Sequence, residues 1–110
     1  MKMNKEFAGA AIAASLALAL LPALPAAAGV STVGCTNGGS MTGVSNTTTV
    51  RSVNEVNCGT VYVRARYGTP GGNAFTNYTS SATITTQSGL PNVNRGDHYA
   101  QRRALFYTTP

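Results

Sequence analysis

A change of composition after Ala28 leaves only about 82 residues from which a folded domain can be built. A domain of that size buries only about 60% of the surface that its unfolded chain exposes, so its hydrophobic core is small. The sequence contains one source of additional stability, because both of its cysteines, Cys35 and Cys58, follow the change. In an oxidising compartment each has a single intramolecular partner, which predicts a Cys35–Cys58 disulfide. Two free thiols, or a disulfide between two chains, are the alternatives.

Residues 1–28 have the three parts of an export signal. Two lysines near the start precede an uncharged apolar stretch from Ala8 to Leu21, and Ala26-Ala27-Ala28 has the small-residue pattern that a signal peptidase recognises. A retained membrane anchor is the alternative, but two prolines near the end of the segment would interrupt a spanning helix. We therefore predict a signal peptide over residues 1–28, a single secreted domain over residues 29–110, an extracellular location and no stable membrane span after cleavage.

The predicted secreted domain is basic and contains no lysine. Its six arginines outnumber two carboxylates, those of Glu55 and Asp97, which leaves a net charge of +4. Outside the cell such a charge favours anionic partners, including phospholipid headgroups, wall polymers, acidic polysaccharides and any nucleic acid that is present. Solubility is the alternative explanation, because a domain with so few charges needs some net charge to stay dispersed. We expect the partner to be an anionic component of the cell envelope or an extracellular polymer, and we expect no nucleic acid.

Residues 29–110 are rich in Thr, Ser, Asn, Val and Gly, a composition typical of β-strands joined by turns. The clearest strand is Val61–Tyr67, in which two sets of side chains alternate with the period of two that marks a half-buried strand. Five further segments have strand character: Val30–Thr36, Thr47–Val53, Ala74–Ser80, Ala82–Gln87 and His98–Thr108. The last segment also has high helix propensity, so a helix is the alternative there.

Turn-forming residues separate these strands. Asn37-Gly38 is a hairpin signal, Gly43 marks a further break, and a cluster of Gly and Pro over residues 68–73 ends the clearest strand. Residues 88–97 read as a loop, and we interpret Arg95-Gly96-Asp97 within it as a turn rather than as the adhesive tripeptide that integrins recognise. Strands about 8 to 12 residues apart predict an all-β fold, a small antiparallel β-sandwich with one disulfide.

Three side chains of the strand Val61–Tyr67 point to the same face. Tyr62, Arg64 and Arg66 are two residues apart, so consecutive members lie about 6.6–7 Å from one another. Guanidinium groups bind phosphate and carboxylate oxygens bidentately, and a tyrosine adds a flat amphipathic surface. These residues predict a surface-binding patch, and at most one of Arg102 and Arg103 extends it, because adjacent strand residues point to opposite faces. A solvated strand face without a ligand is the alternative.

The inventory of reactive groups argues against catalysis and metal binding. His98 is the only histidine, and the sequence has no Gly-x-Ser-x-Gly nucleophile motif. A zinc site at the two cysteines would need further soft ligands. We therefore expect no catalytic residue, no metal and no cofactor. The resulting prediction is a protein that acts without catalysis, by binding at the cell envelope or to extracellular anionic surfaces.

A sequence resemblance implies a more specific activity. Tyr67-Gly68, Ala74–Tyr78, Tyr99-Ala100 and Phe106-Tyr107 resemble the lactococcin-type bacteriocins, which are small exported β-sandwich proteins. The resemblance covers residues 59–107 and implies, as the alternative function, an antibacterial protein that attacks cell-wall synthesis at its lipid-linked precursor. This chain departs from the family in having no tryptophan, one histidine and two cysteines.

Overall fold

The structure, a computed structural model, describes residues 29–110, so the predicted signal peptide lies outside the described residues. In this part the chain is all-β, and it contains no helix with the length and apolar character needed to cross a membrane. The strands follow one another in this order: β1 (Gly29–Gly34), β2 (Ser40–Ser45), β3 (Val50–Val56), β4 (Val61–Thr69), β5 (Gly72–Phe75), β6 (Thr79–Ser81), β7 (Ile84–Gln87), β8 (Val93–Ala100) and β9 (Arg103–Thr108).

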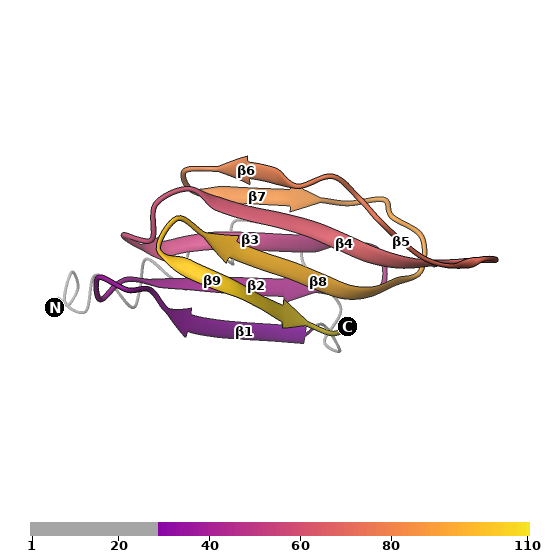
Figure 1. Ribbon diagram of the computed structural model, residues 1–110, viewed down its shortest axis with the longest axis horizontal. Helices are drawn as coiled ribbons and strands as arrows, with labels where there is room; N and C mark the ends of the chain where they lie inside the picture. Colours follow the sequence, from indigo (N-terminus) through magenta and orange to yellow (C-terminus); the bar gives the residue numbers. More distant parts are fainter. Residues whose placement is uncertain (1–28) are drawn as a thin grey trace, which may run out of the picture.

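The strands form two sheets that pack face to face (Figure 1). Sheet A has the strand order β1-β2-β3-β7, and sheet B has the order β5-β4-β8-β9, with the short strand β6 also paired to β4. Neighbouring strands are antiparallel throughout both sheets. The predicted small antiparallel β-sandwich is therefore confirmed.

Strand β4 is central in sheet B and has the alternation that the sequence predicts. Val61, Val63 and Ala65 are fully buried against sheet A, whereas the residues between them are partly exposed on the other side. Burying a valine side chain contributes about 1.5–3 kcal/mol. A shift of one residue would exchange these apolar side chains for arginines and a tyrosine, so the alternation determines which face of β4 meets the core.

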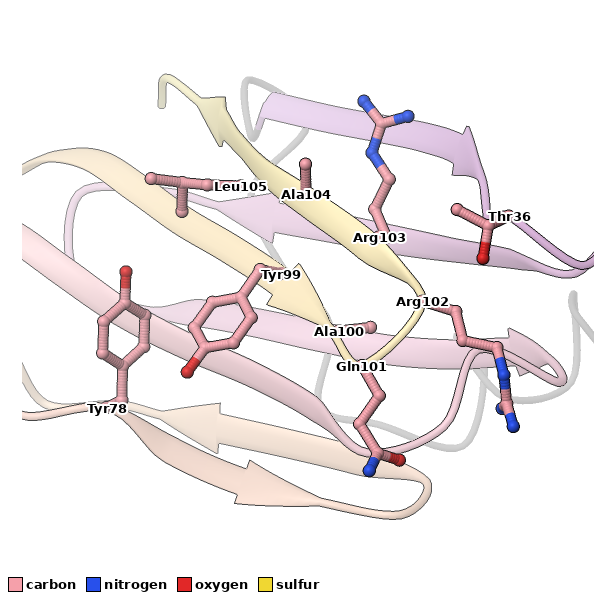
Figure 2. A pocket seen from close by; sticks show the side chains of 9 residues that line it. All are labelled: Thr36, Tyr78, Tyr99, Ala100, Gln101, Arg102, Arg103, Ala104 and Leu105. Atoms are coloured by element: carbon pink, nitrogen blue, oxygen red, sulfur yellow. The ribbon is translucent and has the colours of Figure 1, made fainter.

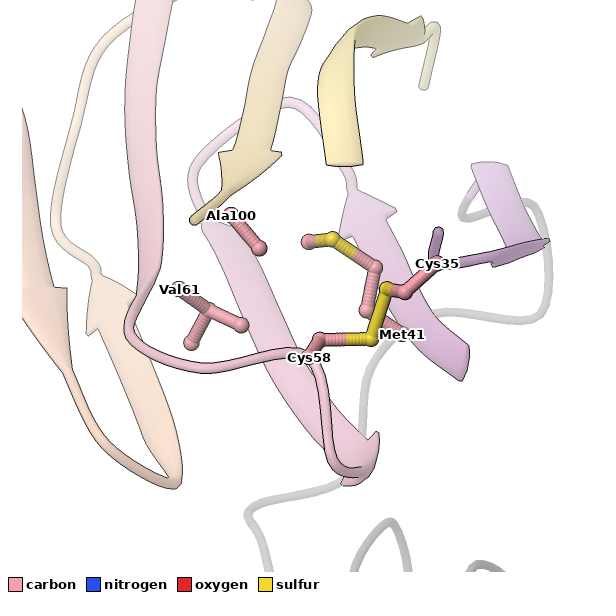
Figure 3. Packing of buried hydrophobic residues seen from close by; sticks show 5 residues of the cluster. All are labelled: Cys35, Met41, Cys58, Val61 and Ala100. Atoms are coloured by element: carbon pink, nitrogen blue, oxygen red, sulfur yellow. A yellow bond between two sulfur atoms is a disulfide. The ribbon is translucent and has the colours of Figure 1, made fainter. Parts of the chain in front are cut away.

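The predicted disulfide joins Cys35 to Cys58 within the chain, with 5.6 Å between the two Cα atoms. Cys35 directly follows β1, and Cys58 lies in the connection that carries the chain from β3 in sheet A to β4 in sheet B. The bond therefore ties an edge strand to a crossover between the sheets. It packs in a buried cluster with Met41, Val61 and Ala100 (Figure 3). A second buried cluster continues the core and consists of Val50, Val63, Ala65 and Val93.

Turn predictions are confirmed in part. Asn37-Gly38 joins β1 to β2, and Gly38 has a φ of 87°, which glycine adopts without steric cost. The glycine and proline cluster at residues 68–73 forms the hairpin between β4 and β5. The single strand predicted over Ala74–Ser80 is instead divided between β5 and β6, which pair with different parts of β4.

Two strands occupy segments in which the sequence predicts none. Strand β2 spans the predicted break at Gly43, and β8 begins inside the predicted loop, so the loop over residues 88–97 and the turn at Arg95-Gly96-Asp97 are wrong. Each strand contains a glycine beside the imidazole of His98. A Cβ atom would lie 2.7 Å from ring Cδ2 if added at Gly43, and 2.7 Å from ring Nε2 if added at Gly96. Glycine disfavours strands locally, but here only glycine leaves room for the buried ring.

The segment His98–Thr108 is a hairpin rather than one strand, and the helix alternative is wrong. Strand β8 ends at Ala100, and Gln101 and Arg102 form the turn to β9. The backbone N–H of Gln101 donates to the carbonyl of Thr60 over 3.0 Å, and that of Arg102 donates to the carbonyl of Cys58 over 3.1 Å. These bonds tie the turn to the crossover beside the disulfide, a long-range contact that helix propensity does not include.

Candidate functional site

The outer side of sheet B, which faces away from sheet A, brings together arginines and aromatic residues that are far apart in the sequence. The register of β4 and β8 places Tyr62 opposite Tyr99, Arg64 opposite Asp97 and Arg66 opposite Arg95. We call this surface the aromatic–arginine face, and it consists of Tyr62, Arg64, Arg66, Phe75, Tyr78, Arg95, Asp97, Tyr99 and Tyr107. The predicted patch residues of β4 therefore share one face, as their spacing requires.

Asp97 is the centre of this face and is completely buried. Its Oδ2 accepts a hydrogen bond from Arg64 Nε at 2.9 Å, and its Oδ1 accepts one from Arg95 Nε at 2.8 Å. A second contact of 3.3 Å joins Arg95 Nη2 to Oδ2, so Arg95 binds the carboxylate bidentately. A buried carboxylate is tolerated when it is paired in this way. The hydrogen bond to Asp97 raises the pKa of Arg64 above its ordinary value, and the two arginines are fixed around one buried charge.

Aromatic rings cover the same two arginines. The Cζ atom of Arg64 lies 4.2 Å from the centre of the Phe75 ring and 4.8 Å from that of Tyr78. The Cζ atom of Arg95 lies 4.1 Å from the centre of the Tyr107 ring. Cation–π contacts of this kind contribute about 0.5–1 kcal/mol at exposed sites. They also hold the planes of the guanidinium groups in place on the sheet.

Three tyrosines extend the face beyond the arginines. Tyr62 and Tyr99 stack with their ring centres 4.3 Å apart, and Tyr78 meets Tyr99 at an angle of 83° with the centres 5.0 Å apart. Both arrangements are favourable for aromatic pairs. Burial raises the pKa of Tyr78 above its ordinary value. Phe75 and Tyr107 remain about half exposed, with 46% and 52% of their surface accessible. The face therefore offers solvent an ordered aromatic surface.

Hydrogen-bond donors remain on the face after its internal contacts are formed. Arg64 and Arg66 each use Nε internally, Arg64 toward Asp97 and Arg66 toward Oδ1 of Asn94 at 2.7 Å. Within residues 29–110 the terminal nitrogens of Arg64 and Arg66 form no hydrogen bond. The three arginines and one carboxylate give the face two net positive charges. Each guanidinium group is thus oriented at its base and has terminal N–H groups left to donate.

The structure separates Arg102 and Arg103, the other two residues of the predicted patch, from the three arginines of the face. Arg102 is exposed in the turn between β8 and β9. Arg103 pairs with the inward-facing Ala100, and its Nη1 lies 3.4 Å from the carbonyl oxygen of Gly34. Both arginines line a hollow that begins beside Tyr99, at the end of the hairpin (Figure 2).

His98 lies on the opposite side of β8, completely buried between the sheets. Its Nδ1 is 2.8 Å from Ser52 Oγ, and its Nε2 is 2.7 Å from Thr108 Oγ1. Burial lowers the pKa of His98 to about 4, and the charge of neighbouring Asp97 offsets this only in part. Both ring nitrogens are thus engaged in the core. His98 and Asp97 diverge, as expected for consecutive strand residues.

The sequence predicted only three residues of this face and missed the other six, which are Phe75, Tyr78, Arg95, Asp97, Tyr99 and Tyr107. A signal for part of this set was present, because Arg95, Asp97 and Tyr99 are two residues apart, the period at which strand residues share a face. The sequence nevertheless predicts a turn at Arg95-Gly96-Asp97, because glycine and aspartate are common in turns. Nothing in the local sequence indicates that Phe75 and Tyr78 reach the same arginine, because β5 and β6 pair with β4 at positions that only the sheet defines.

An ordered surface of arginines and aromatic rings can bind an anion that also has an apolar part. In the part of the chain that the structure describes, no group of three or more His, Cys, Asp or Glu side chains is placed to hold a metal ion. Comparison of the chain with family models, curated proteins and solved structures found no match.

Proposed function

We propose that the protein is secreted and acts without catalysis, by binding an anionic polymer of the cell envelope or of the extracellular medium through the aromatic–arginine face. One observation carries this proposal: Arg64 and Arg66 are anchored through Nε and keep terminal N–H groups unpaired within residues 29–110. The planar fork of such a group matches carboxylate and phosphate oxygens.

Order in the unbound protein favours binding by this face. Immobilising a flexible side chain on binding costs about 0.5–1.5 kcal/mol, and an arginine already fixed by a buried carboxylate and two rings avoids much of that cost. The arginines also lie on neighbouring strands rather than on loops, so their separation is set by the sheet. Arginines at fixed separations are best matched by a polymer whose anionic groups are regularly spaced.

The test is co-sedimentation of the purified protein with an insoluble phosphate-bearing wall polymer, with a neutral polysaccharide as the comparison. Within residues 29–110 the Arg66 side chain forms a single hydrogen bond, to Asn94, so Arg66→Gln should preserve the fold. We expect it to weaken binding about threefold to tenfold, the range for one partly exposed charged hydrogen bond. Raising NaCl from about 50 to about 500 mM should weaken binding further, because salt screens exposed charges.

Ser88→Glu is the matched control, because it lowers the net charge by the same one unit at an exposed loop position after β7. It should change the affinity much less than Arg66→Gln does. Equal effects of the two variants would show that only net charge matters. Binding that is insensitive to salt and to Arg66→Gln would overturn the proposal.

An antibacterial protein of the lactococcin type is the second candidate. The observation in its favour is the architecture, a small antiparallel β-sandwich of the kind that the sequence resemblance implies. The purified protein should then arrest the growth of sensitive bacteria at nanomolar to micromolar concentration. No inhibition across a broad panel of strains would remove this candidate.

A further inference from the structure

We infer that the hollow beside Tyr99 is a binding subsite for a sugar ring that carries a carboxylate, so that the preferred polymer is an acidic polysaccharide. This inference rests on the proposed function, because it identifies the ligand class of the same surface. The hollow adjoins the aromatic–arginine face through Tyr78 and Tyr99, which belong to both (Figure 2). A bound polymer chain can therefore occupy the hollow and the arginines together.

The walls of the hollow suit a ring with apolar faces. Tyr78 and Tyr99 meet almost at right angles and form a corner, and the apolar residues Ala104 and Leu105 of β9 also line the hollow. Leu105 is 43% exposed, so its apolar surface is accessible to a ligand. Tyrosine combines an apolar ring with a polar tip. A sugar ring has C–H groups on its faces and hydroxyl groups at its edge, and it matches such a corner.

The rim of the hollow supplies hydrogen-bond donors. Gln101 Oε1 accepts a hydrogen bond from the backbone N–H of Thr60 at 2.9 Å, which fixes the orientation of the side-chain amide. The Nε2 atom of Gln101 is then available to donate to a ligand. Arg102, which is exposed, belongs to the same turn and also lines the hollow. The turn itself is held by three backbone hydrogen bonds of 2.8–3.1 Å, to Thr36, Cys58 and Thr60. The donors are thus presented by a fixed turn rather than by a flexible loop.

The donor-rich rim favours an acidic sugar over a nucleobase. Hydroxyl and carboxylate oxygens of a uronic acid all accept hydrogen bonds, whereas base edges present donors and acceptors together. The carboxylate also complements the positive charge of Arg102 and of the adjoining arginines. In a polymer with one carboxylate on each ring, every repeating unit offers a ring that can pack against Tyr78 and Tyr99 and a carboxylate that can bind an arginine.

The experiment is calorimetric titration of the purified, oxidised protein with polygalacturonate and with its methyl-esterified form, which has the same rings without the charge. We expect esterification to weaken binding about 10-fold or more, since it removes the charge that strengthens the hydrogen bonds to the carboxylate. Inorganic polyphosphate, an anion without rings, should bind more weakly than polygalacturonate. Oligothymidylate that binds more tightly than polygalacturonate, and loses that binding when the hollow is filled, would overturn the inference in favour of a nucleobase.

Ala104→Leu enlarges an exposed side chain that lines the hollow, and Ala82→Leu makes the same change at an exposed position in the β6–β7 turn. The first should weaken polygalacturonate binding about fivefold or more, and the second should leave it unchanged. Arg102→Gln should weaken binding of the acid but not of the ester. Unchanged binding in both Ala104→Leu and Arg102→Gln would overturn the inference.

Failure of the inference is distinguishable from failure of the proposed function. If polyphosphate and polygalacturonate bind equally, and only Arg66→Gln weakens them, the arginines bind anions and the hollow has no role. If none of the polyanions binds, both proposals fall.

Discussion

Acidification should destabilise the protein through His98. The hydroxyl of Ser52 donates to the backbone carbonyl of Tyr62 over 2.9 Å, so its oxygen accepts the Nδ1–H of His98 at 2.8 Å. The other ring nitrogen, Nε2, then accepts the hydroxyl proton of Thr108 at 2.7 Å. This assignment gives a neutral imidazole that is satisfied at both nitrogens. A proton added at Nε2 would place a positive charge between the sheets. It would also make Nε2 the donor and the Thr108 hydroxyl the acceptor of their hydrogen bond.

The size and sign of the effect follow from the pKa of the folded protein. Burial lowers the pKa of His98 to about 4, whereas that of a histidine in the unfolded chain is about 6.5. Between these values the unfolded chain binds more protons, so stability is fully present above about pH 6.5 and is lost as the pH falls through about 4. The free energy of unfolding should fall by about 2 kcal/mol at pH 5 and by about 3 kcal/mol in total. That is a large share of the stability of a small domain.

Urea unfolding followed by circular dichroism at pH 7, 6, 5 and 4 measures this loss. His98→Gln is the comparison, because glutamine does not titrate and both proteins keep the same carboxylates. We expect the variant to be less stable at pH 7, because it loses the bonds to Ser52 and Thr108, but its stability should depend less on pH over the window from about 6.5 to about 4. Equal pH dependence of the two proteins, or an imidazole resonance that titrates near pH 6.5 in the folded state, would refute the reasoning.

Two further changes test the packing. Replacing Cys35 and Cys58 by serine should lower the free energy of unfolding by about 3–3.5 kcal/mol, from the loop closed by a separation of 23 residues, and thermal unfolding with and without reductant measures it. Gly43→Ala should cost about 1–3 kcal/mol, because the added Cβ would meet the ring of His98 at 2.7 Å. Gly34→Ala is its control, since the nearest atom there is 4.0 Å away, and equal losses in the two variants would contradict the packing argument.

Local sequence patterns determined several features of this fold. The alternation over Val61–Tyr67 identifies a half-buried strand and places Tyr62, Arg64 and Arg66 on one face, because neighbouring strand residues point to opposite sides. The Cys35–Cys58 pairing follows from a count of two cysteines once an oxidising compartment is assumed. Both features depend only on a short segment or on the number of cysteines, so no knowledge of the tertiary structure is needed to predict them.

Only the tertiary structure decided the rest of the candidate site. From the sequence alone, Asp97 is predicted to lie in a turn. In the folded protein β4 and β9 flank it, and it is the buried charge that orients two arginines. The sequence predicts a break at Gly43 and a turn at Gly96, but both glycines lie in strands, on either side of the imidazole of His98. In each case a contact between residues distant in sequence outweighs the local preference, because burying a ring or pairing a charge involves more free energy than the propensity of one residue.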